Sequence, residues 1–347
     1  MSTNESGDDV IKWGVGLGKV LSASAVPIMA ARAEQLGYDE AWVSNERFHR
    51  DMFVSLGAAA VATHTIRLGT FVADPFMIRP PVTAAAVASV DELSGGRAMF
   101  GIGAGGSGFA QVAMHPVKPV RAMETALTAF RALLAGERVT CEDANFELRE
   151  AVLEMAPRPD IPLTLASQSP KMLELGGRIA DSVMISTFAD RSLFELAVSW
   201  AAKGAEQADR QLEIGTDVVA RIDVAIDEDL DRARDALRPL VGQLLVLLYP
   251  NWFFLEHLGV TVADEVREFA QRRDYAGMRD NLALVPDRLV DGFGWVGPPE
   301  RVADRVQELT DLGVRRIVIL PHSLTGDPEP TIAAFKQVVA PRVERAT

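Results

Sequence analysis

The stretch IRLGTFVADPFMIRPPVTAAAVASVDELSGGRAMFGIGAGG, residues 66–106, decides how this chain folds. Its pattern predicts a strand, an Asp-Pro loop, a helix, a Gly-Gly turn and a second strand. Both strands end in small residues, which leave the main chain accessible at the strand ends. A flat ligand with a phosphate-bearing tail could lie directly against backbone of this kind.

The same unit of helix, glycine and strand recurs along the chain. Apolar stripes with helical spacing over residues 26–36 and 302–312 each end at a glycine, and strand-like segments follow over 40–44 and 316–320. A further copy occupies residues 171–186. Additional strands are expected over residues 12–17, 67–72, 98–103, 163–166 and 218–226.

About eight strands that alternate with helices predict parallel strands joined by helical crossovers. No change of composition and no long Pro/Ser linker divides the chain. We therefore expect an α/β fold, a (β/α)8 TIM barrel formed as a single domain by residues 11–347, in preference to an open sheet. Residues 136–162 and 230–297 are longer than simple connections, and such excursions usually shape the mouth of a barrel or a subunit contact.

Composition excludes several classes of partner. The 347 residues include 35 basic and 48 acidic side chains, and the net charge of -13 gives no electrostatic reason to bind nucleic acid or anionic lipid. Residues 240–258 are the most apolar stretch, but polar residues and a proline interrupt it, so we expect no membrane span. Cys141 is the only cysteine, which rules out an intrachain disulfide.

The amino end, MSTNESGDDV, is polar and acidic, unlike a secretory signal, and residues 1–10 are expected to form a flexible tail. With one cysteine and no signal, the expected location is the cytoplasm. The five histidines show neither an H-E-x-x-H motif nor paired metal-ligand spacing, and the sequence therefore predicts no metal site.

Glycines at 101, 103 and 106 fit the dinucleotide fingerprint G-x-G-x-x-G, but the context of a Rossmann fold is missing. Pro116 and Pro119 follow instead of an immediate helix, and no strand ending in an acidic residue lies about twenty positions on. The glycines either let a planar ligand lie against the strand end or form a structural turn. Ser107 resembles a nucleophile elbow without its final glycine, which argues against a serine hydrolase.

Two polar segments follow predicted barrel strands, at the face where barrel active sites lie. In the first, Ser44 to His49, either Glu46 or His49 could transfer a proton, although charged residues in such a loop are often simply solvated. In the second, Ser167, Gln168 and Ser169 precede a helix that opens with proline. This helix start could bind an anion such as a phosphate, or it could carry an ordinary serine cap.

The order of several motifs is similar to that of the luciferase-like monooxygenase superfamily, over residues 11–341. The resemblance is carried by WGVGLG, EQLGYDEAWVSNE, IRLGTFVADPF, DELSGGRAMFGIGAGG, SQSPKMLELGGRIADSVMIS, GPPERVADRVQELTDLGVRRIVI and PHSLTGDPEP. Two of these motifs, DELSGGRAMFGIGAGG and SQSPKMLELGGRIADSVMIS, resemble most closely the branch that uses the deazaflavin coenzyme F420, typified by methylenetetrahydromethanopterin reductase. The resemblance implies a TIM barrel with a flavin or deazaflavin at its carboxyl-end face and a homodimer.

The resemblance also implies site residues. Family members have a cis peptide behind the central cofactor ring, and it aligns with Phe71 and Val72. The further cofactor contacts carried over are Asn45 and Glu46 beside the ring, Asp74 near its polar edge, Gly103, Ala104, Gly105 and Gly106 along the side chain, and Ser167, Gln168 and Ser169 toward the phosphate tail. Two positions depart from the family pattern, because Asn45-Glu46 replaces a common Asp-His pair and Gly106 replaces an acid.

Three functions follow as hypotheses. The first is an F420-dependent oxidoreductase that transfers hydride between C5 of the deazaflavin and a small organic substrate, with Glu46 or His49 handling the proton. The second is an FMN-dependent monooxygenase on the same barrel. The third is a barrel that binds a flavin or deazaflavin without turnover, since the two departures could mean lost chemistry. The sequence identifies neither the substrate nor the direction of the reaction.

Overall fold

A computed structural model describes residues 10–46, 48–105 and 109–343, and its parallel strands close into a barrel. The eight strands of the ring pair in the order β9, β11, β1, β2, β3, β4, β7 and β8, and β8 pairs with β9 to close it. The predicted TIM barrel is therefore confirmed. The ring consists of β1 (Lys12–Leu17), β2 (Glu40–Ser44), β3 (Arg67–Phe71), β4 (Ala98–Ile102), β7 (Leu163–Ser167), β8 (Ser182–Ser186), β9 (Val218–Ile226) and β11 (Arg316–Pro321).

Contacts divide the chain into two compact units. The first contains the residues up to Ser186 together with Ala197–Ala220 and Val314–Val318, so it holds six whole barrel strands and the first residues of β9 and β11. The second contains Thr187–Leu196, Arg221–Gly313 and the residues from Ile319 on. No helix in the described part of the chain is both long and apolar enough to cross a membrane.

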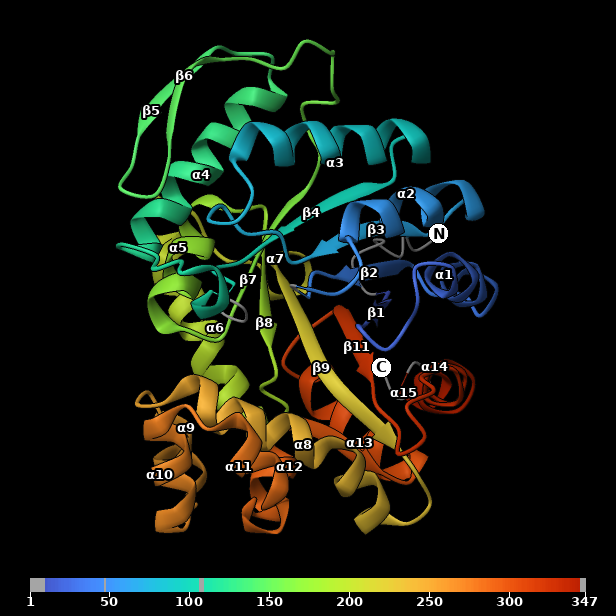
Figure 1. The fold of residues 1–347 in the computed structure, drawn as a ribbon. Coiled ribbons are helices and arrows are strands. Elements are labelled where there is room, and N and C mark those ends of the chain that lie inside the picture. The colour runs from blue at the N-terminus through green and yellow to red at the C-terminus, as the bar shows by residue number, and fades with distance from the viewer. Residues whose placement is uncertain (1–9, 47, 106–108, 344–347) are drawn as a thin grey trace. The chain divides into compact units, whose positions relative to one another are not determined.

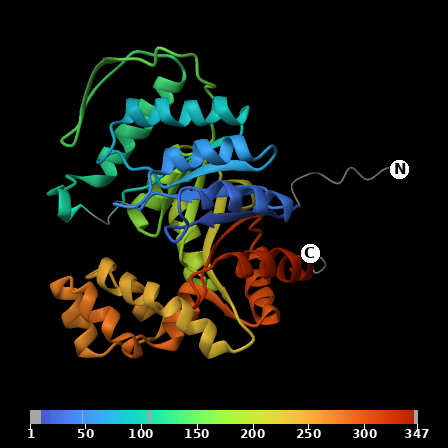
Figure 2. The same cartoon turned by 45° about the vertical axis from the view of Figure 1, so that its right-hand side comes forward.

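In the first unit, helices α1 to α5 pack against one another in sequence order on the outside of the strands (Figures 1 and 2). The predicted Gly-Gly turn ends α3, where Gly95 and Gly96 adopt φ angles of 67° and 90° that favour glycine. The helices of this unit are α1 (Ala25–Gln35), α2 (Met52–Ala62), α3 (Pro80–Ser94), the 3-10 turn Ala110–Val112, α4 (Pro119–Leu134), α5 (Pro170–Ile179), most of α6 (Arg191–Glu206) and α7 (Ile214–Asp217).

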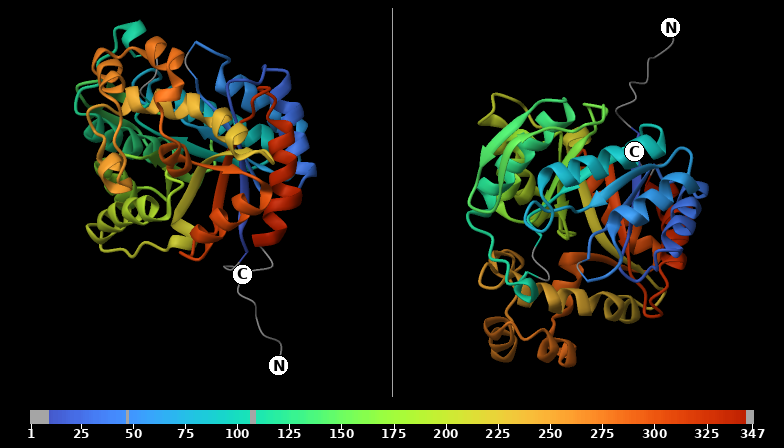
Figure 3. Two further views of the ribbon diagram at one scale, coloured as in Figure 1. Left: turned by 90° about the horizontal axis from the view of Figure 1, so that it is seen from below. Right: turned by 45° about the horizontal axis from the view of Figure 1, so that its top comes forward.

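The first predicted excursion, residues 136–162, forms an antiparallel hairpin of β5 (Val139–Glu142) and β6 (Glu147–Ala151) beside α4 (Figure 3). Beyond the hairpin, the guanidinium of Arg158 donates to both carboxylate oxygens of Asp91, at 3.0 and 2.8 Å. Asp91 also accepts from the backbone N–H of Ala98 at 3.1 Å. The DELSGGR motif therefore ties the excursion to the start of β4.

The second excursion, residues 230–297, is mostly helical, as expected. Its long helix α8 packs against α10, α11 and α12 (Figure 1). The helices and strand of the second unit are α8 (Leu230–Leu248), α9 (Phe253–Leu258), α10 (Asp264–Arg272), α11 (Tyr275–Asp280), the 3-10 turn Leu282–Leu284, α12 (Asp287–Phe293), β10 (Gly294–Gly297), α13 (Pro299–Thr310), α14 (Glu329–Ala334), the π turn Phe335–Val339 and α15 (Ala340–Val343). Strand β10 pairs with β9 in parallel.

The interior of the barrel is built around the indole of Trp42, which is fully buried. Side chains from five other strands complete one cluster with it, namely Met99, Ala166, Met184, Val219 and Val318. The indole lies directly on backbone, because a Cβ atom added at Gly69 would lie 2.3 Å from its Cε3 atom and one at Gly101 3.0 Å from its Cζ3 atom. Glycine in β3 and β4 is thus a packing requirement.

A buried ionic group orients this indole from the amino-end side of the barrel. The Nε1–H of Trp42 donates to Oε2 of Glu40 at 2.9 Å, and the guanidinium of Arg316 donates to Oε1 at 2.9 Å. Burial acts to raise the pKa of Glu40, but Arg316, the Trp42 hydrogen bond and Arg67 outweigh it and hold that pKa below its ordinary value. Glu40 therefore stays charged and paired inside the barrel.

Substitution of Gly69 by Ala tests the packing of Trp42. The added methyl group has no space beside the indole, so Gly69→Ala is expected to lower the free energy of unfolding by about 1 to 3 kcal/mol. Gly57→Ala, whose Cβ would lie 3.7 Å from the nearest atom, a Leu93 methyl, is the matched control within α2 and is expected to be neutral or stabilising. Urea unfolding curves measure both, and equal stabilities would contradict the packing argument.

A second prediction concerns Glu34, which holds the loop between α2 and β3. One of its carboxylate oxygens accepts from the backbone N–H groups of His64, Thr65 and Ile66, at 2.9, 2.6 and 2.9 Å. Burial acts to raise its pKa, but these hydrogen bonds lower the pKa to about 2 from 4.5. The resulting stabilisation is complete above pH 4.5 and is lost as the pH falls toward 2. Glu34→Gln should therefore flatten the acid limb of a stability-against-pH curve, and an unchanged limb would exclude this role.

Candidate functional site

The candidate site is built on the end of β3, where the peptide bond between Phe71 and Val72 is cis. This confirms the position that the family resemblance implied. Asn45, from the loop after β2, holds both carbonyl groups: its backbone N–H donates to Phe71 O at 2.8 Å, and its side-chain Nδ2 donates to Val72 O at 3.1 Å. Phe71 and Val72 also pack on the Trp42 cluster. The main chain at this strand end is therefore fixed from both sides.

At the adjacent end of β4, Gly103 is buried and packs closely against its neighbours. A Cβ atom there would lie 2.8 Å from Cγ2 of Val72 and 3.0 Å from the carbonyl oxygen of Ala166. The backbone N–H of Gly103 donates to Ala73 O at 2.9 Å, which binds the two strand ends together. Ala104 is half-buried, Gly105 is exposed with a φ of 65°, and Gly106 lies outside the described residues. The small residues thus bring three strand ends into contact through their backbones.

Asp74 orders the loop that borders this surface. It is only 4% exposed, and its Oδ1 atom accepts from the backbone N–H groups of Phe76 and Met77, at 3.0 and 2.9 Å. The ring of Phe76 makes an edge contact with Phe109, at 5.8 Å between centroids, which joins the loops after β3 and β4. Asp74 therefore shapes the loop through main-chain hydrogen bonds.

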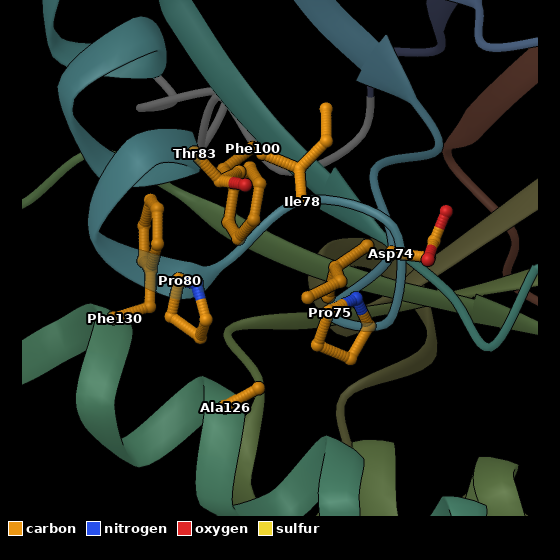
Figure 4. Close-up of a pocket in the computed structure, with 9 residues that line it drawn as sticks. Asp74, Pro75, Ile78, Pro80, Thr83, Phe100, Ala126 and Phe130 are labelled. Carbon is orange, nitrogen blue, oxygen red and sulfur yellow. The ribbon is translucent and has the colours of Figure 1, made fainter. Parts of the chain in front are cut away.

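A small cavity lies behind the loop, between α3, α4 and β4 (Figure 4). Its volume of about 10 Å³ is close to that of one water molecule, which is too small for a cofactor. The stacked rings of Phe100 and Phe130 line it, and the carboxylate of Asp74 points away from these rings. The cavity is a packing void that supports the loop from behind.

Ser167, Gln168 and Ser169 lie where β7 ends and α5 begins. Ser167 and Gln168 are half-buried and Ser169 is exposed. The Oγ atom of Ser167 accepts from the backbone N–H of Ser169 at 3.0 Å, and Ser169 is the N-cap residue of α5 with no cap bond from its own side chain. The Ser169 hydroxyl therefore does not cap its own helix. Because Ala166 contacts Gly103, this segment continues directly from these strand ends.

The two residues considered for proton transfer occupy the loop after β2. Glu46 is half-buried and His49 is exposed, and a backbone hydrogen bond from His49 N to Glu46 O closes a turn at 3.1 Å. Within the described part of the chain, neither side chain has a hydrogen-bond partner that fixes it. The structure therefore brings Asn45 onto the strand end but leaves the orientation of Glu46 and His49 to a ligand or to solvent.

Sequence reasoning missed one buried polar group. Arg221 and Asp223 in β9 form a bidentate ion pair, and Asp223 also contacts the ring of His322 at 2.7 Å. The available signal was the pair of charges at alternate positions in the otherwise apolar strand VVARIDVAI. Among the described residues, no group of three or more His, Cys, Asp or Glu side chains is arranged to hold a metal ion.

Comparisons with known proteins identify the family of this chain. The family model described as luciferase-like monooxygenase matches residues 14–316. The chain therefore belongs to the luciferase-like monooxygenase family, and it is an enzyme of the oxidoreductase class.

Relatives in this family act on different compounds. The chain is 32% identical over 292 residues to 5,10-methylenetetrahydromethanopterin reductase from Methanolobus tindarius, which covers 83% of this chain and 87% of that protein. It is 29% identical to phthiodiolone/phenolphthiodiolone dimycocerosates ketoreductase from Mycobacterium tuberculosis, over 86% and 81% of the two chains. A solved structure of coenzyme F420-dependent tetrahydromethanopterin reductase from Methanopyrus kandleri superimposes with a TM-score of 0.84 at 26% identity, over 96% and 99% of the chains.

Proposed function

We propose that this protein is an F420-dependent oxidoreductase that transfers hydride between C5 of the deazaflavin and a small organic substrate. The observation that carries the proposal is the main-chain strand end at Phe71–Val72, held by Asn45 and packed closely against Gly103. The Methanopyrus kandleri reductase, whose structure is similar and which is F420-dependent, supports the choice of cofactor. Because the two curated relatives reduce different compounds, the substrate class stays open.

In this proposal each segment of the surface has a task. The cofactor ring lies against the backbone of Phe71 and Val72, and Gly103 lets β4 pack closely against Val72 beside it. The loop ordered by Asp74 borders the polar edge of the ring, with Asn45 and Glu46 beside it. Gly103, Ala104, Gly105 and Gly106 follow the side chain of the cofactor, and Ser167, Gln168 and Ser169 bind its phosphate at the start of α5.

When bound, a deazaflavin supplies hydride chemistry at C5. The protein's own contribution is to orient the ring, exclude water and exchange a proton with the substrate. Asn45 contributes to orientation by fixing the two carbonyl groups behind the ring. A rigid backbone surface is suited to this task because it loses little conformational freedom when the cofactor binds.

Cofactor titration separates this proposal from its rivals. The protein is titrated with oxidised F420 and with FMN, and binding is followed by fluorescence. Sub-micromolar affinity for F420 and none for FMN is the expected result, and the reverse would favour an oxygen-activating FMN monooxygenase. Turnover is then screened with reduced F420, by the gain of deazaflavin absorbance with 5,10-methylenetetrahydromethanopterin and a panel of ketones as hydride acceptors. Tight binding with no hydride exchange in either direction would favour a barrel that binds without catalysis.

Asn45→Ala tests the role of the side-chain amide at this surface. Loss of the hydrogen bond to Val72 O is expected to raise the Kd for F420 roughly fivefold, since one such bond contributes about 1 kcal/mol. Asn281→Ala, which removes a side-chain hydrogen bond to Gly277 O at 2.8 Å on α11, is the matched control and should leave the Kd unchanged. Equal affinities of both variants and the parent protein would remove Asn45 from the site.

We further propose that the protein is a homodimer through α1, α2 and α3. Helix α2, MFVSLGAAAVA, has no charged residue, although Val54 and Val61 on its outer face are each 67% exposed. The neighbouring helices add further exposed apolar side chains, namely Ile28 at 70%, Val82 at 61% and Leu93 at 55%. An apolar surface of this kind is complementary to itself, which suits a twofold contact between two copies.

Val61→Asp tests this interface. A charge at the centre of an apolar contact must be desolvated on association, so the variant is expected to be monomeric at micromolar concentrations where the parent protein is dimeric. Val338→Asp changes an exposed valine outside these helices and serves as the control. Size-exclusion chromatography with light scattering measures the mass of each, and a monomeric parent protein would refute the dimer.

A further inference from the structure

Exposed apolar side chains gather in the loops that leave β1, β2, β3 and β4. Each of these four loops carries at least one large apolar side chain that water reaches. Val20 is 60% exposed, Phe48 67%, Met77 36% and Val112 41%. Because β1 to β4 are parallel neighbours in the ring, the loops that leave them lie at the carboxyl end of the barrel. We call these four side chains the apolar rim.

The opposite end of the same strands differs. Residues 36–39, 63–66 and 95–97 lead into β2, β3 and β4, and among them the structure shows no exposed large apolar side chain. Ahead of β1, only Val10 is such a residue within the described part of the chain. Single exposed apolar side chains are ordinary, but a set of them at one end of a barrel marks a surface that contacts something. That end is the one that carries the candidate site.

Three contacts join the loops of the apolar rim to one another. The guanidinium of Arg50 donates to Lys19 O at 3.4 Å, which links the loops after β1 and β2. Asn45 links the loop after β2 to the end of β3. The edge contact of Phe76 with Phe109 links the loops after β3 and β4. The rim therefore borders the strand end that forms the candidate site, and every residue involved belongs to the first compact unit.

Phe48 is held in the apolar rim by an unfavourable backbone conformation. It occupies the third position of the turn that the hydrogen bond from His49 N to Glu46 O closes, and its φ angle is 65°. A positive φ at this position ordinarily selects glycine or asparagine. The exposed ring gains little from burial that would offset the strain. Backbone strain of this kind is found at ligand-binding sites, where its cost is part of the function.

We propose that the apolar rim binds an alkyl chain or an apolar ring of the substrate, next to the carbon that exchanges hydride with the cofactor. The inference rests on the proposed function and narrows its substrate class. Active sites of barrel enzymes are built from the loops at the carboxyl end, and small-molecule sites are lined mostly by apolar side chains with a few polar groups. Phe48 is then a specificity-determining residue that contacts the apolar group of the substrate.

Charges beside the apolar rim favour a small ligand over a second copy of the chain. Lys19 is exposed next to Val20, and Phe48 is followed by His49 and Arg50, which are exposed as well. A protein face laid over the rim would have to desolvate these polar groups. A single chain or ring can cover the apolar side chains while the charged groups stay in water. Helix α2, proposed above for the dimer contact, has no charged residue.

Dependence on chain length tests the proposal, with reduced F420 as the hydride donor and methyl ketones from acetone to methyl hexyl ketone as acceptors. In the parent protein, kcat/KM is expected to rise roughly two- to fourfold for each methylene that the rim removes from water. Phe48→Gly removes the ring, and glycine suits a φ of 65°, so the variant should fold normally. Its loss of kcat/KM should grow with chain length and reach roughly tenfold for methyl hexyl ketone.

Two further variants accompany this test. Phe48→Leu restores an apolar side chain and should recover part of the dependence on chain length. Tyr275→Ala removes another exposed ring, 42% accessible on α11 in the second unit, and should keep the parent dependence. Equal losses of Phe48→Gly for acetone and for methyl hexyl ketone would overturn the proposal. A lower mass of Phe48→Gly in light scattering, with the dependence retained, would make the rim a contact between copies and also overturn it.

A measurement without F420 separates this proposal from the proposed function. Saturation-transfer NMR follows methyl hexyl ketone in the presence of the cofactor-free protein. Transfer to the terminal methyl protons is expected with the parent protein and with Tyr275→Ala, and it should be largely lost with Phe48→Gly. Equal transfer in all three proteins, or none with the parent, would refute the apolar rim as a binding surface. Transfer that depends on Phe48 in a protein without affinity for F420 would instead refute the proposed function.

Discussion

The packing of one indole against two glycines is the constraint on which the rest of this protein depends. Trp42 fills the barrel interior so closely that β3 can pass it only where Gly69 presents bare backbone, and Gly101 of β4 packs against both the indole and the Thr70 carbonyl. Glu40 and Arg316 hold the indole from the amino-end side through buried hydrogen bonds. Phe71 and Val72 pack against the same cluster, so the interior packing fixes the position of the strand end that forms the candidate site.

From this base the candidate site is made mostly of main chain. Thr70 links β3 to β4, because its hydroxyl donates to Gly101 O at 2.7 Å and accepts from Gly101 N at 2.8 Å. Asn45 then reaches across from β2 to the carbonyl groups at 71 and 72. A surface of backbone groups recognises the shape and edge of a ring system. It places few demands on side-chain chemistry, and relatives on the same barrel act on different compounds.

Much of the architecture could be predicted because its signals are local. The recurring units of helix, glycine and strand predicted the barrel. The predicted Gly-Gly turn at residues 95–96 lies where the apolar stripe of helix α3 ends. The position of the cis bond followed from the family pattern around residues 71–75. The place of Asp74 near the polar edge of the ring is implied by the family resemblance and stays a prediction. In the structure its Oδ1 atom accepts from the N–H groups of its own loop.

Sequence by itself determined the fold and the family and indicated the strand ends proposed to carry the site, because periodicity, glycine placement and short motifs act over a few residues. Only the tertiary structure decided that Asp223 meets His322, 99 residues away along the chain, at 2.7 Å. That contact depends on which face of β9 each side chain occupies and on β9 being the neighbour of β11 in the closed ring. Which strands become neighbours, and which side chains then meet across them, is decided when the barrel closes. No local sequence pattern encodes these contacts.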